Sequence, residues 1–82
     1  MSYEKVLQAG KIVIGTKQTI RALKEGKATE VIVAEDADLP IIEKVTAAAN
    51  EANVPVTKVD SMKKLGKACK IQVGAAAVAI LR

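Results

Sequence analysis

Short apolar runs alternate with amphipathic stretches along the chain, which predicts strands that alternate with helices. The run Val31-Ile32-Val33-Ala34 is continuously apolar and rich in β-branched residues, which is typical of a strand covered on both faces. The segment from Val56 to Val59 alternates instead, with Lys58 facing outward. The sequence thus predicts strands at residues 13–14, 31–34, 56–59 and 76–81.

Helix-capping residues precede the amphipathic stretches. The expected cap residues are Ser2, Thr16, either Asp36 or Asp38, and Ser61. The helices are expected to run to about Lys11, over residues 17–25, to about Asn53, and to Gly66 or Cys69. The third helix shows the clearest pattern, because Ile41, Val45, Ala48 and Ala52 recur at helical spacing after Pro40 in the first turn.

Alternating helices and short strands predict an α/β fold, a three-layer α/β/α sandwich around a four-stranded mixed sheet. The 82 residues make a single domain, 1–82, without an internal repeat, a low-complexity tract or a linker.

Composition excludes several classes of function. The chain has one tyrosine, Tyr3, and no Phe or Trp, so it lacks the side chains on which RRM and OB folds stack single-stranded bases. It has no His, which removes the commonest metal ligand and general base. No P-loop, nucleophile–base pair or metal-spaced cluster is present. We expect no enzyme activity, no metal and no cofactor.

The single cysteine, Cys69, cannot form a disulfide within the chain, which fits a reducing compartment. The N-terminus lacks the apolar run of a signal peptide, and no stretch approaches the ~18 apolar residues of a membrane span. We therefore expect a cytoplasmic protein without a membrane partner, and a monomer.

The net charge of +4 is unevenly distributed. Residues 1–30 contain six Lys/Arg and three acids, residues 31–55 one lysine and five acids, and residues 56–82 six Lys/Arg and one acid. An acidic middle between basic ends is expected if the ends converge on one polyanion-binding face. A surface of ordinary solvated lysines would give the same counts.

The segment from Gly15 to Arg21 is the first candidate site. A glycine turn opens a helix there, and a helix start is electropositive because its first N–H groups are unpaired. Acids are favoured in a first turn, yet this one contains Lys17 and Gln18, with Arg21 one turn further on the same face. The segment therefore suits a phosphate or a purine edge. Thr16 is expected to cap the helix, and a solvated first turn is the alternative.

Three carboxylates, Glu35, Asp36 and Asp38, follow the buried strand at the sheet edge where open α/β folds bind ligands. They could hold Mg²⁺ or accept a phosphoryl group. Helix capping and dipole complementarity account for Asp36 and Asp38 without a metal, and this interpretation is favoured. A carboxylate here could also accept a hydrogen bond from a base amino group.

The segment Ile71-Gln72-Val73-Gly74 is the third candidate. Ile71 and Val73 would form an apolar contact surface if they lie at a loop tip. Alternatively they begin the last strand and point inward, and the sequence leaves the two possibilities open.

Three segments in matching order resemble the kink-turn RNA-binding ribosomal protein family, the L7Ae family, and in particular its short bacterial members. They are Gly15-Thr16-Lys17-Gln18-Thr19-Ile20-Arg21, Val31 to Asp38, and Leu65-Gly66-Lys67-Ala68-Cys69. Members are α/β/α sandwiches that bind the kink-turn, a sharply bent RNA duplex with tandem sheared G·A pairs beside a bulge. The resemblance covers nearly the whole chain.

The resemblance implies a role for each candidate segment. The glycine-turn helix would dock in the RNA groove at the G·A pairs through Lys17, Gln18 and Arg21, with Lys-Gln where the family commonly has Asn-Glu. The apolar loop would cover the bulge and its flipped-out nucleotide. Asp38 matches a family position near that nucleotide, Glu35 and Asp36 are weaker candidates, and Lys70 stands where a glycine usually follows the cysteine.

The expected function is therefore a non-catalytic protein that recognises and stabilises kink-turns in structured ribosomal or regulatory RNA. Its partners would be such RNA and the ribosome, not DNA. Two alternatives remain: a structural ribonucleoprotein subunit held mainly by protein contacts, and a metal-dependent phosphoacceptor using Glu35, Asp36 and Asp38.

Overall fold

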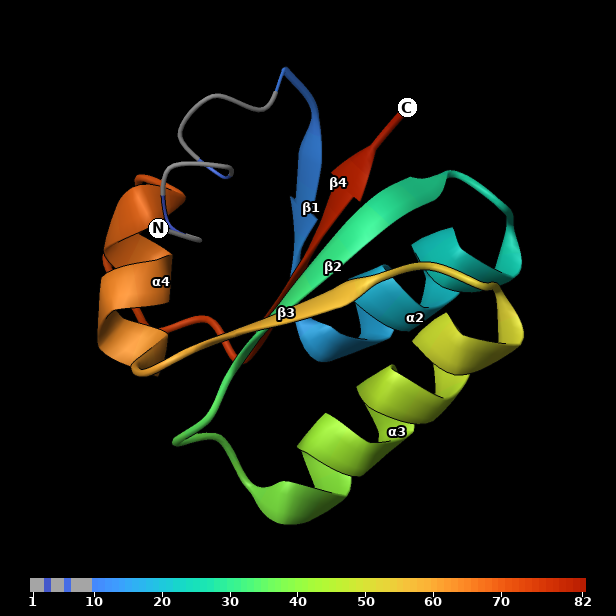
Figure 1. Cartoon of the computed structure of the whole chain (residues 1–82). Helices are drawn as coiled ribbons and strands as arrows, with labels where there is room; N and C mark the ends of the chain where they lie inside the picture. Colours follow the sequence, from blue (N-terminus) through green and yellow to red (C-terminus); the bar gives the residue numbers. More distant parts are fainter. Residues whose placement is uncertain (1–2, 4–5, 7–9) are drawn as a thin grey trace.

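Strand β2 (Ala28–Ala34) is the central strand of the computed structural model, which describes residues 3, 6 and 10–82 (Figure 1). Its residues from Val31 to Ala34 are at most 1% exposed, as the continuous apolar run predicts. Val31 and Val33 belong to one core cluster and Ile32 and Ala34 to the other, because successive side chains of a strand point to opposite faces.

The described residues form a four-stranded sheet in the order β1-β4-β2-β3. Its other strands are β1 (Ile12–Ile14), β3 (Val56–Val59) and β4 (Ala77–Leu81). Strand β4 runs antiparallel to both β1 and β2, while β3 runs parallel to β2. The predicted mixed sheet is confirmed.

Helices cover both faces of this sheet (Figure 1). Helices α2 (Thr16–Lys24) and α3 (Leu39–Glu51) pack on one face, over Val31, Val33 and the alanines of β4. Helix α4 (Met62–Ala68) packs on the other face, where Leu65 is fully buried together with Ile32. The result is the predicted three-layer α/β/α sandwich with a small-aliphatic core on each side.

The start of α2 differs from the prediction in one respect. Gly15, not Thr16, occupies the cap position, and Thr16 is the first helical residue. Gly15 has a φ of 113°, and its carbonyl accepts the N–H of Thr19 at 2.9 Å. The prediction that Thr16 caps the helix is therefore wrong by one residue, because the turn needs a backbone angle that glycine adopts without strain. Asp38 and Ser61 do occupy the cap positions of α3 and α4.

The helix predicted from Ser2 to about Lys11 lies mostly outside the described residues. Val6 is buried at 3% exposure under the α4 side of the sheet, as expected. Gly10 and Lys11 form a bend before β1, so the helix does not extend to Lys11. Across the described residues, no helix is both long and apolar enough to cross a membrane.

Candidate nucleic-acid interface

One end of the sheet gathers the three candidate segments. Strands β1, β2 and β3 end there, β4 begins there, and α2, α3 and α4 each begin just after a strand ends. Backbone hydrogen bonds of 2.7–3.0 Å link the segments: Gly15 N–H to Ala77 O, Ala34 N–H to Ala76 O, Glu35 N–H to Val59 O, and Ala75 N–H to Met62 O. The glycine turn at Gly15, the acidic segment at residues 35–38 and the apolar loop at residues 71–74 therefore form one continuous surface at this end of the sheet. We call it the strand-end surface.

Gly15 gives the start of α2 an open geometry. A Cβ on Gly15 would meet only the flexible end of the Gln18 side chain, which can move, so the φ of 113° is what favours glycine at this position. Glycine also supplies no capping oxygen for the first N–H groups of the helix. A helix start of this kind attracts anions, since the macrodipole adds a partial positive charge to the unpaired donors.

Cationic side chains continue from that helix start along one face of α2. Lys17, Arg21 and Lys24 follow at helical spacing and, together with Ile20, line an open depression of about 460 Å³. The Arg21 Nε atom donates to Glu25 at 3.3 Å, and the two side chains are 80% and 41% exposed. Hydrogen bonds from Lys27 and then from Arg21 lower the pKa of Glu25. Sequence reasoning missed Lys24, although its spacing of seven residues from Lys17 could have indicated it.

The loop at residues 71–74 folds back along α4. Ile71 N–H donates to Gly66 O at 3.1 Å, and Gly74 lies against Met62. A Cβ on Gly66 would overlap the carbonyl oxygen of Val73, so the loop can approach the helix only because residue 66 is glycine. This contact explains the Leu65-Gly66 pair of the motif in physical terms.

Val73 and Ile71 differ in the exposure of their side chains. Val73 is 71% exposed at the strand-end surface, which fits the contact-surface interpretation. Ile71 is half-buried and packs against the core beneath α4, which fits the inward-pointing interpretation. Gln72 and Gly74 are exposed beside Val73.

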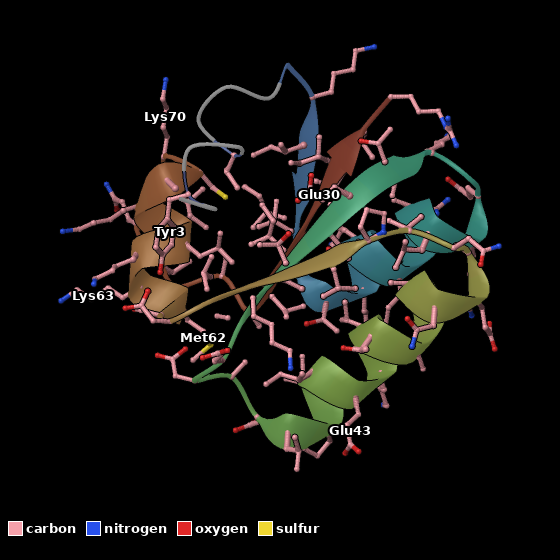
Figure 2. All side chains as sticks on the ribbon, viewed as in Figure 1. Tyr3, Glu30, Glu43, Met62, Lys63 and Lys70 are labelled. Atoms are coloured by element: carbon pink, nitrogen blue, oxygen red, sulfur yellow. The ribbon has the colours of Figure 1, made fainter. Side chains whose placement is uncertain are left out.

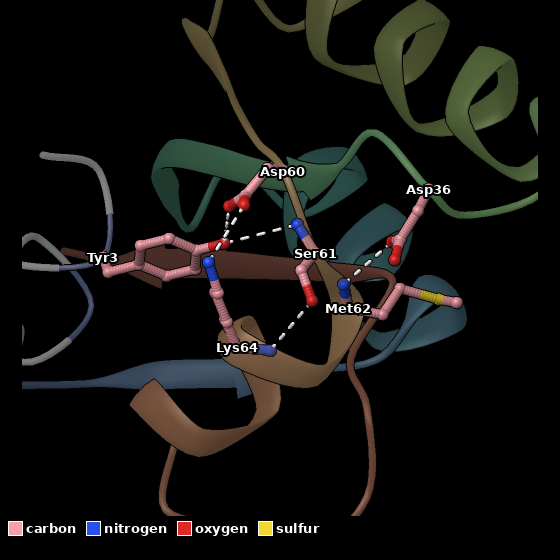
Figure 3. A network of polar contacts seen from close by, with 6 residues as sticks. All are labelled: Tyr3, Asp36, Asp60, Ser61, Met62 and Lys64. Atoms are coloured by element: carbon pink, nitrogen blue, oxygen red, sulfur yellow. Dashed lines mark hydrogen bonds and ion pairs between the residues drawn. The ribbon is translucent and has the colours of Figure 1, made fainter.

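The acidic segment has a clear structural role. An Asp36 carboxylate oxygen accepts the N–H of Met62 at 2.8 Å and so caps α4 from outside, alongside Ser61, whose hydroxyl accepts the N–H of Lys64 (Figure 3). Asp38 occupies the cap position of α3 without a capping hydrogen bond from its side chain, and Glu35 is exposed. Among the described residues no three potential ligands are grouped in a way that could hold a metal ion.

Replacing Asp36 with alanine should destabilise the protein by about 1–2 kcal/mol, because the first N–H of α4 loses its charged acceptor. Thermal unfolding measures this loss. The matched control is Glu35→Ala, which removes an exposed neighbouring carboxylate without a hydrogen bond to the described chain and should change stability little. Equal melting temperatures for the two variants would contradict the capping role.

A second polar network lies beside that cap. The Tyr3 hydroxyl donates to Asp60 and accepts the N–H of Ser61, while Lys64 pairs with Asp60 at 3.2 Å (Figure 3). The hydrogen bond from Tyr3 and then the one from Lys64 lower the pKa of Asp60. The Lys64 ammonium group is therefore already paired within the protein.

Burial raises the pKa of the Cys69 thiol, which makes it a poor nucleophile.

Leu39 is an exposed apolar residue that the sequence did not single out. It is 65% exposed in the first turn of α3 and, with Ile42 and Lys58, borders a shallow pocket of about 220 Å³. Its one signal in the sequence is its position between Asp38 and Pro40, outside the helical apolar pattern that begins at Ile41. Leu39 and Val73 thus give the strand-end surface two exposed apolar side chains.

Comparisons with known proteins agree with this geometry. The chain is 99% identical over 82 residues, all of both chains, to "RNA-binding protein YbxF" of Geobacillus stearothermophilus. It is 59% identical over 81 residues, 99% of each chain, to an "RNA-binding protein" of Bacillus pumilus. The structure superposes on the "Giardia lamblia 15.5kD RNA binding protein" with a TM-score of 0.84 at 30% identity, covering 98% of this chain and 67% of that one.

A family model matches almost the full length. It covers residues 2–82 and describes the ribosomal protein L7Ae/L30e/S12e/Gadd45 family. The match includes the glycine turn, the acidic segment and the loop after α4, the three segments that meet at the strand-end surface. The chain belongs to the ribosomal protein L7Ae/L30e/S12e/Gadd45 family.

Proposed function

We propose that this protein binds structured RNA and recognises the kink-turn, through the strand-end surface and without catalysis. The observation that supports this most directly is the hydrogen bond from Gly15 N–H to Ala77 O. It joins the cationic start of α2 to the strand that follows the apolar loop, so the segments that carry Lys17 and Val73 meet at the same end of the sheet. Relatives named as RNA-binding proteins, matched over their full length, add to the argument.

Each part of the surface has a role in this proposal. The start of α2 enters the groove at the sheared G·A pairs, where Lys17 and Gln18 donate to base edges and Arg21 donates to a base or a phosphate. Val73 covers the bulge, because an exposed apolar side chain suits an unstacked base. Asp38 is near the flipped-out nucleotide and accepts a hydrogen bond from it.

In this proposal the protein selects its RNA mainly by the shape of the bent duplex. The family ligand is a bent duplex whose kinked conformer is one member of an ensemble, and a protein that contacts only that conformer shifts the population toward it. Lysine and arginine contacts to phosphates add affinity that depends on salt but not on sequence. The missing aromatic side chains fit this mode, since no base needs to stack on a sheet face.

A binding assay with two RNA duplexes tests the proposal. One duplex contains the tandem G·A pairs and the bulge, and the other has Watson–Crick pairs in place of the G·A pairs. We expect the first duplex to bind far more tightly at equal salt, because only it can present the bent groove. Equal affinity for both duplexes would refute kink-turn recognition.

The same assay distinguishes kink-turn recognition from the alternative, a ribonucleoprotein subunit held mainly by protein contacts. Such a subunit would not bind the isolated kink-turn duplex, and replacing Lys17 would have no effect. A non-catalytic monomer that works on ribosomal or regulatory RNA is the form of the proposal that we favour.

A further inference from the structure

A second cationic surface lies on α4, away from α2. Lys63, Lys67 and Lys70 are all exposed; Lys63 and Lys67 are four residues apart and share one side of α4, and Lys70 follows in the turn just after the helix ends. Figure 2 shows Lys63 and Lys70 extending from the two ends of α4, and neither side chain points toward the sheet. Lys63, Lys67 and Lys70 thus lie along α4 and the turn that follows it. We call them the α4 lysine row.

The α4 lysine row has no acidic partner among the residues that the structure describes. Within residues 3, 6 and 10–82, none of the three lysines forms an ion pair, whereas the neighbouring Lys64 pairs with Asp60. The sequence from Ser61 to Gly74 contains four lysines and no acid. Lys63 and Lys67 lie one helical turn apart on α4, and like charges at this spacing repel one another.

Lys70 adds a second, independent observation. The described helices α2, α3 and α4 end in the same hydrogen-bonded turn, in which a residue with positive φ follows the helix cap. That residue is Gly26 after α2 (φ 70°), Asn53 after α3 (φ 56°) and Lys70 after α4 (φ 65°). Glycine and asparagine are favoured in this conformation and lysine is not. Keeping a lysine there costs stability, which points to a function for its charge.

The α4 lysine row is continuous with the strand-end surface. Helix α4 begins at that surface, where Met62 is bonded to Asp36 and Ala75, and it lies on the sheet face opposite α2 (Figure 1). From Lys63 the row leads away from the strand ends toward Lys70. A polyanion held at the strand ends could therefore pass the Asp36 carboxylate at the start of α4 and extend along the lysines beyond it.

We propose that the α4 lysine row binds the phosphate backbone of an RNA segment that flanks the kink-turn. This inference rests on the proposed function, and it adds a second contact surface on the opposite side of the sheet. The row reads no sequence, because lysine ammonium groups contact phosphates as point charges. It sets how strongly the protein distinguishes a kink-turn with long flanking arms from one with trimmed arms.

A triple substitution tests the inference. The test variant is Lys63→Gln, Lys67→Gln and Lys70→Gln, and the control is Lys11→Gln, Lys27→Gln and Lys44→Gln, which removes the same charge elsewhere. Affinity is measured over a salt series for a long-armed and a trimmed kink-turn duplex. Each lost phosphate contact lowers the slope of log affinity against log salt by about 0.7–0.9, so the test variant should lose about 2–3 on the long-armed duplex alone.

Two results would overturn the inference. One is a test variant whose slope on the long-armed duplex equals that of the control variant. The other is an equal loss on the long-armed and the trimmed duplex, which would place the lysines in the kink-turn core. Failure of the proposed function gives a different result from failure of this inference. If kink-turn recognition fails, wild-type protein binds the G·A and Watson–Crick duplexes equally.

A single substitution separates charge from backbone effects. Lys70→Gly should raise the melting temperature by roughly 4–8 °C, because it relieves the strained φ, and it should weaken binding of the long-armed duplex several-fold. Asn53→Gly, the matched change at the end of α3, should leave RNA affinity unchanged. If Lys70→Gly bound the long-armed duplex as tightly as wild type, the charge of Lys70 would have no part in binding.

Discussion

Replacing Gly66 with alanine should destabilise the protein by about 1–3 kcal/mol, although alanine is the better helix former. The new methyl group would overlap the carbonyl oxygen of Val73, which is backbone and cannot rotate away. Either α4 or the loop at residues 71–74 must move. Because Ile71 N–H and Ala75 N–H bond to α4, the loop cannot shift without losing these hydrogen bonds. Thermal or urea unfolding measures the loss.

The same change should weaken RNA binding, because it displaces Val73 from the strand-end surface. Gly10→Ala is the matched control, since a Cβ on Gly10 meets no atom within 4 Å and should change neither property. RNA affinity is measured at a temperature where both variants remain folded. A Gly66→Ala protein as stable and as tightly binding as the Gly10→Ala protein would show that the loop does not depend on this close approach.

The architecture could be predicted because the core follows the local apolar pattern closely. The run from Val31 to Ala34 predicts a strand covered on both faces, and β2 has helices on each side. The alternation in Val56 to Val59 predicts an exposed Lys58, and this is confirmed. Neighbours in sequence therefore suffice to assign both segments to strands.

The cap of α2 at Gly15 and the second cap of α4 at Asp36 could not be predicted from the sequence, because both depend on tertiary contacts. The cap of α2 falls on Gly15 because its N–H bonds to Ala77, more than sixty residues away, and this contact fixes an unusual φ. Asp36 was considered as a cap for the helix that follows it, but it caps α4 instead. In both cases the hydrogen-bond partner lies on another element at the same end of the sheet, and local propensity cannot predict such a contact.

The candidate site could be predicted as a set of segments, but not as a surface. Gly15, the acidic segment and the loop at residues 71–74 were each selected from the sequence, and the mixed sheet brings them to the same end. The sequence could not tell Ile71 from Val73, since both are β-branched and a single residue separates them. Exposure separates them, because Ile71 packs under α4 and Val73 does not. That these residues bind RNA remains a prediction.

Replacing Lys17 or Arg21 with alanine should weaken kink-turn binding by about 1–3 kcal/mol each, the range for a lost base-edge contact. Both side chains are exposed on the same face of α2, so neither change should affect folding beyond a few tenths of a kcal/mol. Lys17→Ala should also reduce the preference for the G·A duplex over the Watson–Crick duplex, because the base edges at the G·A pairs are its contact. Titrations with both duplexes measure the two effects.

Matched controls exist for both variants. Lys27→Ala breaks an ion pair with Glu25, as Arg21→Ala does, but Lys27 lies beyond the end of α2 and should bind RNA normally. Lys44→Ala removes the same charge as Lys17→Ala from α3. A contact to phosphate alone would lower the salt slope by about 1 and weaken both duplexes alike, which distinguishes it from base recognition. If Lys17→Ala and Lys44→Ala bound equally well, the start of α2 would not be the part of the protein that enters the groove.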